Sequence, residues 1–176
     1  MTESEMLRAV ADRQAITELL YRYCRAVDRI DEKLGHSIWH EGAVADYGDF
    51  YQGDGPGVID LICGQHRHTL YHTHQMSNVI IQLDGDRAGS ESYVTANLRV
   101  KNGDRLMQMT VWSRYVDQWS RRNGYWGIDK RIAIRDFDEV REVQPLSRVE
   151  SEGSRDSDDA SYAVLTRLQS VSRQDI

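Results

Sequence analysis

The sequence predicts an α+β domain in which N-terminal helices pack against a strongly curved antiparallel sheet. Apolar residues recur at helical spacing through the first 28 residues, whereas four later runs are strand-rich and are separated by Asp-Gly or Asn-Gly pairs. Because these pairs supply the positive φ that tight hairpins require, three of them in succession predict a four-stranded meander.

The first helix is expected from residue 2 to about residue 28. Thr2 and Glu5 fit a capping box, in which each side chain accepts a backbone N–H of the first turn. The apolar stripe that follows consists of Ile16, Leu19, Leu20, Tyr23 and Val27. Asp28 lies at the edge of this stripe. Because burying an unpaired charge is costly, its carboxylate is expected to have a partner.

The remaining elements follow from composition and turn signals. A helical segment is expected through Trp39, then a short strand over 43–47, a glycine-rich loop at 53–57 and a short helix over 58–67. The four strands of the meander are expected over 74–83, 90–101, 106–120 and 125–138. The last two are long for a small domain, which predicts that the sheet curls around something.

A change in composition divides the chain into a domain at 1–143 and a polar tail at 144–176. Residues 147–161 are rich in Ser, Asp and Glu and almost lack apolar residues, which predicts a tail that is partly disordered or docks on a neighbouring subunit. A short helix is expected around 163–168, where four apolar residues return.

Charge and cysteine content exclude several classes of protein. Acidic residues outnumber basic ones by 28 to 22, and no block of Lys or Arg occurs, so neither nucleic acid nor an anionic membrane is expected as a partner. Cys24 and Cys63 form neither a disulfide framework nor a zinc spacing. Without a membrane span or a signal peptide in the sequence, the expected location is the cytoplasm.

Three motifs in the correct order resemble the SnoaL-like branch of the nuclear transport factor 2-like superfamily. They are Asp12-Arg13-Gln14-Ala15-Ile16 with Tyr23 and Asp28, then His74-Gln75-Met76-Ser77-Asn78, then Tyr115, Asp117, Arg121, Arg122, Gly124, Trp126 and Arg131. The resemblance covers about residues 6–138 and implies a cone-shaped fold. Among enzymes of this superfamily the chain resembles hexachlorocyclohexane dehydrochlorinase and, more distantly, scytalone dehydratase.

The resemblance implies a catalytic dyad of His74 and Asp28. Imidazole titrates near neutral pH and can take a proton from carbon or oxygen, while a carboxylate on its far nitrogen fixes the tautomer and stabilises the imidazolium. The alternative is a core histidine with satisfied hydrogen bonds and an aspartate that caps the helix end.

Arg131 matches an arginine that helps the departing halide in the dehydrochlorinase, and its alternative role is a salt bridge to Asp129 or Asp117. Tyr47 matches a tyrosine of scytalone dehydratase and could donate to a developing enolate, or simply form an aromatic wall. Two departures mean that neither reaction is expected to transfer intact. Tyr23 replaces a lysine of the dehydrochlorinase, and the second histidine of scytalone dehydratase has no equivalent nearer than Asn102.

The expected substrate-binding residues line an apolar interior suited to a small ring compound. They are Tyr23, Trp39, Tyr47, His72, Met109 and Trp112. His72 is included because it shares a strand face with His74.

All six histidines lie between residues 36 and 74, and the spacing of His66, His68, His72 and His74 suggests a metal site. However, the helix end near residue 67 interrupts this set, and no Cys or carboxylate completes it. No metal and no other cofactor are therefore expected, and His66 and His68 are expected to face solvent.

The leading hypothesis is a cofactor-independent lyase, of dehydratase or dehydrohalogenase type, or an isomerase that acts on a small hydrophobic cyclic substrate. Two alternatives are a non-catalytic protein that binds a hydrophobic ligand and the small subunit of a ring-hydroxylating dioxygenase. The resemblance also implies a homo-oligomer, either a dimer or a trimer.

Overall fold

The computed structural model describes the backbone of residues 2–144 and 153–171, and side chains up to residue 165. The chain divides into two compact units, Met1–Val143 and Gln144–Ile176. In the second unit, helix α4 (Ala160–Val171) includes the predicted short helix. The first part of the predicted polar tail, residues 145–152, lies outside the described residues. No helix among the described residues is long and apolar enough to cross a membrane.

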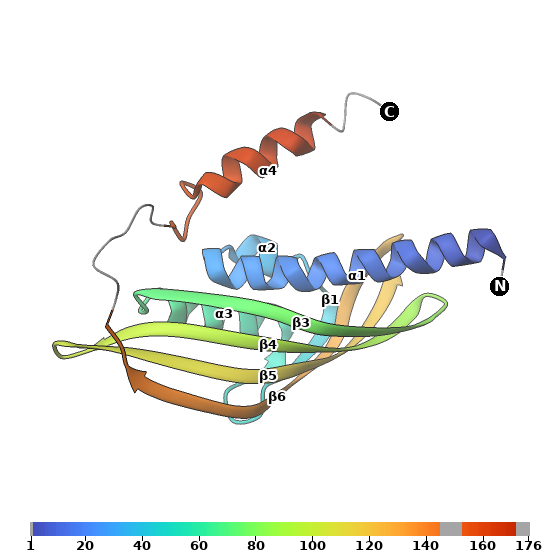
Figure 1. The fold of residues 1–176 in the computed structure, drawn as a ribbon. Helices are drawn as coiled ribbons and strands as arrows, with labels where there is room; N and C mark the ends of the chain where they lie inside the picture. Colours follow the sequence, from blue (N-terminus) through green and yellow to red (C-terminus); the bar gives the residue numbers. More distant parts are fainter. Residues whose placement is uncertain (1, 145–152, 172–176) are drawn as a thin grey trace. The chain divides into compact units, whose positions relative to one another are not determined.

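The first unit consists of helices packed against a six-stranded, curved and unclosed sheet (Figure 1). Its elements are α1 (Glu3–Arg29), α2 (Glu32–His36), β1 (Trp39–Asp46), β2 (Gln52–Asp54), α3 (Gly55–His66), β3 (Tyr71–Asp84), β4 (Arg87–Asn102), β5 (Arg105–Arg122) and β6 (Tyr125–Glu142). The strand order is β2-β1-β6-β5-β4-β3. The predicted meander is confirmed, and β1 adds to it in parallel with β6. Strand β2 was not predicted.

Local sequence signals explain where the helices begin and end. The capping box at Thr2 and Glu5 forms, and α1 ends at Ile30 in the left-handed conformation. Helix α3 begins three residues before the predicted start, because the Asp54 carboxylate accepts the Gly57 N–H at 2.6 Å and Pro56 occupies the first turn.

A bulge in β3 explains the asparagine of the His74–Asn78 motif. The register moves from Ser77 opposite Tyr93 to Ile80 opposite Glu91, so β3 contains one extra residue. Asn78 has φ 49°, a left-handed conformation that Asn adopts more readily than most residues. The bulge bends β3, which lies beside α1 in Figure 1.

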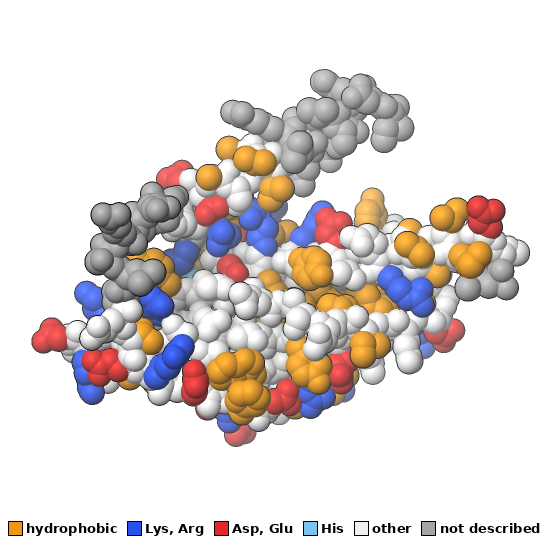
Figure 2. Space-filling view, viewed as in Figure 1, with side chains coloured by type: hydrophobic (Ala, Val, Ile, Leu, Met, Phe, Trp, Pro, Cys, Tyr) orange, Lys and Arg blue, Asp and Glu red, His pale blue; other side chains and the backbone are white. Residues whose placement is uncertain are grey.

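The two faces of the sheet differ in burial. His74 lies opposite Ala96, which lies opposite Val111, so these residues share the face that the helices cover. The same face carries Tyr115 and Trp119, which pack in the core with residues of α1 and α3. The other face carries polar pairs and exposed aromatic residues, and Figure 2 shows apolar side chains exposed over the strands as well as over α1.

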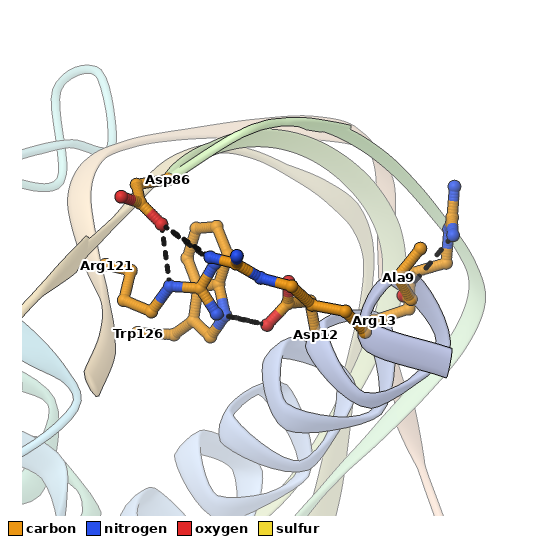
Figure 3. A network of polar contacts seen from close by, with 7 residues as sticks. Ala9, Asp12, Arg13, Asp86, Arg121 and Trp126 are labelled. Atoms are coloured by element: carbon orange, nitrogen blue, oxygen red, sulfur yellow. Dashed lines mark hydrogen bonds and ion pairs between the residues drawn. The ribbon is translucent and has the colours of Figure 1, made fainter. Parts of the chain in front are cut away.

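A buried polar network fastens α1 to the β5–β6 hairpin (Figure 3). The Asp12 carboxylate is only 8% exposed and accepts hydrogen bonds from Trp126 Nε1 at 3.0 Å and Arg121 Nη1 at 2.5 Å. Arg121 also donates to Asp86 at 2.9 Å and lies over the Trp126 ring. Residues of the first and last motifs therefore hold the helix on the sheet.

Candidate active site

The structure brings His74 and Asp28 into direct contact. His74 Nδ1 lies 2.7 Å from Asp28 Oδ1, and the His74 backbone N–H donates to Asp28 Oδ2 at 3.1 Å. The two side chains are 8% and 15% exposed. Asp28 lies in the last turn of α1 and His74 near the start of β3, so the packing of this helix on this strand forms the pair.

The hydrogen bonds of Asp28 determine which nitrogen of His74 can act as a base. A carboxylate only accepts hydrogen bonds, so the His74 proton lies on Nδ1. The lone pair then lies on Nε2, for which the described residues provide no hydrogen-bond partner. This tautomer is the one that general base catalysis requires.

Two further histidines lie beside the dyad. His72 has the same orientation as His74 on β3, and His66 at the end of α3 stacks on it with ring centroids 4.0 Å apart. His66 is 5% exposed, so the prediction that it faces solvent is wrong, whereas His68 is exposed as predicted. Burial, together with His72 and His74, lowers the pKa of His66 from 6.5 to about 3, so its ring is neutral.

The described residues contain no group of three or more His, Cys, Asp or Glu side chains placed to hold a metal ion. His66 and His72 each direct a ring nitrogen at the Val27 carbonyl, at 3.1 Å in both cases. Two of the clustered histidines, His66 and His72, therefore bind the C-terminal end of α1.

Arg131 lies in the core. Its side chain is fully buried and donates to both carboxylate oxygens of Asp117, at 2.7 and 2.8 Å. Of the two predicted salt-bridge partners the structure selects Asp117, while Asp129 pairs with Arg122.

Aromatic rings surround the Arg131 guanidinium. Its central carbon lies 4.3 Å from the centroid of Tyr23 and 4.0 Å from that of Tyr115. One nitrogen, Nη1, has no hydrogen-bond partner among the described residues. Trp39, 7% exposed, packs in the same core, with its ring centroid 5.6 Å from the guanidinium.

The hydroxyl of Tyr47 lies 2.8 Å from that of Tyr23. Burial raises the pKa of the Tyr47 phenol, and the positive charge of Arg131 opposes part of that rise. Tyr47 is therefore a neutral phenol that can donate a hydrogen bond.

Cys24 is a buried thiol on α1 that feels the charges of both Asp28 and Arg131. Burial and, to a lesser extent, the charge of Asp28 raise the pKa of its thiol to about 12, while the charge of Arg131 opposes part of that rise. Both charges therefore act at this position on α1, four residues before Asp28.

The last two predicted binding residues lie on opposite faces of β5. Met109 lies opposite Leu98, which lies opposite His72, so it shares the face of the dyad. The prediction for Trp112 is wrong: it follows Val111, which faces the dyad side, and it stacks on exposed Phe137 with centroids 4.7 Å apart.

Apolar residues that sequence reasoning missed lie next to the dyad on the sheet. They are Ala96, Leu98 and Val111, and the strand register is the signal that places them. Two surface depressions, of about 550 and 700 Å³, lie at the other end of β4 and along β5, and none of the predicted site residues lines either of them.

Comparison with known proteins agrees with the fold. Residues 8–132 match the SnoaL-like domain family. Among solved structures, hexachlorocyclohexane dehydrochlorinase LinA-type3 from Novosphingobium barchaimii is similar with 18% identity and a TM-score of 0.68, over 82% of this chain and 99% of that one. A putative scytalone dehydratase from Novosphingobium aromaticivorans is similar with 18% identity and a TM-score of 0.66, over 81% and 97%.

A third structure, of Rv3472 from Mycobacterium tuberculosis, a protein of unknown function, is similar with 19% identity and a TM-score of 0.62, over 96% of this chain and 93% of that one. No curated protein matches the chain. The family match extends over most of the first unit and includes both members of the His–Asp pair. The chain belongs to the SnoaL-like domain family, with the α+β fold of the nuclear transport factor 2-like superfamily.

Proposed function

We propose that this protein is a cofactor-independent lyase, or an isomerase, in which His74 is the general base and Asp28 orients it. The observation that carries the proposal is the 2.7 Å contact between His74 Nδ1 and Asp28 Oδ1, which leaves Nε2 as the proton acceptor. The printed names of two similar structures, a dehydrochlorinase and a putative dehydratase, support elimination as the reaction.

In the proposed elimination, Nε2 of His74 takes a proton from a substrate carbon. The electrons of that C–H bond form a carbon–carbon double bond, and chloride or hydroxide leaves the neighbouring carbon with its bonding pair. Asp28 stabilises the imidazolium that results. If the electrons instead move onto a carbonyl and a proton returns to another carbon, the same dyad shifts a double bond.

Negative charge that develops away from His74 needs hydrogen-bond donors. Arg131 and Tyr47 are the proposed donors, because Arg131 has an unpaired buried N–H and Tyr47 carries a neutral phenol. Two hydrogen bonds to Asp117 fix the orientation of the guanidinium. The Arg131 donor therefore does not have to reorient as negative charge develops during the reaction.

The apolar residues around the dyad indicate the class of substrate. Ala96, Leu98, Met109 and Val111 extend from His74 along the helix-covered face of the sheet. We propose that they receive a small, largely apolar ring compound. The same surface favours a second candidate function, a protein that binds such a compound without changing it.

A panel of cyclic compounds separates the two functions. Hexachlorocyclohexane isomers report on chloride release, and hydroxylated cyclic ketones report on loss of water. Turnover of any member, slowed when deuterium replaces the hydrogen that is removed, supports the lyase. Compounds that bind in a calorimeter but are recovered unchanged contradict it and favour the binding protein.

A further inference from the structure

The last turn of α1 receives hydrogen bonds from two histidines on other elements. The Val27 carbonyl lies 3.1 Å from His66 Nδ1 and 3.1 Å from His72 Nε2. The final carbonyls of a helix lack their usual partner four residues later, and donors placed there interact favourably with the helix dipole. Within the chain end itself, the Val27 carbonyl accepts only a long bond from the Ile30 N–H, at 3.4 Å, among the described residues. His66 and His72 therefore cap the turn that carries Asp28.

These contacts continue directly into the dyad. Along β3, His72 binds Val27 and His74, two residues later, binds Asp28, the residue after Val27. The His74 backbone N–H adds a second bond to the same carboxylate. Two successive inward residues of the strand thus hold two successive residues of the helix, which fixes how far Asp28 lies from His74.

His66, at the end of α3, supports this arrangement through its ring. Its ring stacks on His72, with centroids 4.0 Å apart, and lies 5.3 Å from the ring of His74. The Thr69 hydroxyl lies 2.9 Å from both Nδ1 of His72 and the His66 carbonyl, and it can donate its single proton to either acceptor. Both histidines are more than nine-tenths buried.

We propose that His66 and His72 are positioning residues of the dyad. They hold the Val27 carbonyl, and through it they keep the carboxylate of Asp28 on Nδ1 of His74. The catalytic role of His66 and His72 rests on the proposed function. Their hydrogen bonds to the Val27 carbonyl do not depend on it, and these bonds can be measured without a substrate.

These hydrogen bonds require a defined proton position on each of the three imidazole rings. A carbonyl oxygen only accepts, so His66 carries a proton on Nδ1 and His72 on Nε2, while His74 carries its proton on Nδ1. A neutral His66 also avoids a positive charge beside the imidazolium that His74 forms during the reaction.

The first test uses the unaltered protein labelled with ¹⁵N-histidine. Nitrogen–proton correlation spectra at neutral pH should show protons on Nδ1 of His66, Nε2 of His72 and Nδ1 of His74. A proton only on Nε2 of His66, or only on Nδ1 of His72, would overturn the proposal. This measurement needs no variant to fold.

The second test removes or keeps each donor. His66→Leu and His72→Leu should make the His74 Nδ1–H exchange with solvent at least tenfold faster. His66→Asn keeps a donor at the δ position and His72→Gln at the ε position, so both should exchange close to the wild-type rate. Folded Leu variants with unchanged exchange would contradict the proposal.

A matched control is His36→Leu, because His36 also binds a carboxylate, Asp60 at 2.7 Å, but does so at the surface. It should leave the His74 proton unaffected. Failure of the inference and failure of the proposed function remain distinguishable. An unchanged exchange rate of the His74 Nδ1–H in the Leu variants refutes only the positioning role, and absence of turnover refutes only the enzyme.

Discussion

Removing one partner of the buried Arg131–Asp117 pair should strongly destabilise the core, and Asp117→Asn is the change that tests this. Both side chains are 0% exposed, and Asp117 is the only carboxylate within salt-bridge distance of the guanidinium among the described residues. The substitution keeps the shape of the side chain but removes its charge. It leaves a buried cation whose remaining partners among the described residues are the aromatic rings of Tyr23, Trp39 and Tyr115.

Breaking a buried ion pair by removing one partner costs about 3–5 kcal/mol, because the remaining charge is desolvated and uncompensated. For a domain of this size, each kcal/mol lowers the melting temperature by roughly 2–4 °C. Asp117→Asn should therefore lower it by roughly 6–20 °C. Urea titration followed by tryptophan fluorescence measures the change in the free energy of unfolding.

Two further variants control this experiment. Asp129→Asn removes a partner of Arg122 from a pair whose side chains are 27% and 49% exposed, and it should cost no more than about 1 kcal/mol. Replacing the buried pair together, by Asp117→Leu with Arg131→Met, should recover most of the loss. If Asp117→Asn costs as little as Asp129→Asn, the reasoning about the buried pair is wrong.

Three other outcomes follow from the structure. The lowered pKa of His66 means that the unfolded chain binds a proton below pH 6.5 while the folded chain does not, so the unfolding free energy should fall by about 2 kcal/mol between pH 7 and pH 5. Urea titrations should show a smaller fall in His66→Asn, and equal slopes would contradict the assignment. Gly55→Ala places a Cβ 2.2 Å from the Trp39 ring and should cost roughly 1–3 kcal/mol, whereas Gly64→Ala in the same helix meets nothing within 4 Å and should be neutral or stabilising in thermal denaturation. The exposed sheet face around Phe137, which is 60% exposed, is the expected contact surface of a homodimer or homotrimer. Light scattering should therefore show an oligomer that Phe137→Glu dissociates. A wild-type monomer would refute this prediction.

Most of the fold could be predicted because its signals are local. The capping box at Thr2 and the three Asx-Gly turns act within a few residues of the chain, and all of them formed as expected. The parallel pairing of β1 with β6 could not be predicted in this way, since it joins residues such as Ala45 and Arg131 that are far apart in sequence. The three residues of β2 contain no apolar pattern that would indicate a strand.

The residues of the candidate site also divide into those that have a local sequence signal and those that do not. Family motifs were needed to associate His74 with Asp28, because no local pattern connects a helix end with a distant strand. The burial of His66, by contrast, had a signal that was not used: it extends the apolar stripe of Ile59 and Ile62 at helical spacing. Strict alternation from Tyr115 would likewise have placed Trp112 on the outer face.

Turnover of the first active compound of the panel by His74→Gln tests the central claim most directly. Without its base the protein should lose about 10²–10⁴-fold in kcat. Asp28→Asn should also lose activity, and the surface variant His36→Gln should retain it. Wild-type kcat in a folded His74→Gln protein would contradict the claim that His74 removes the proton.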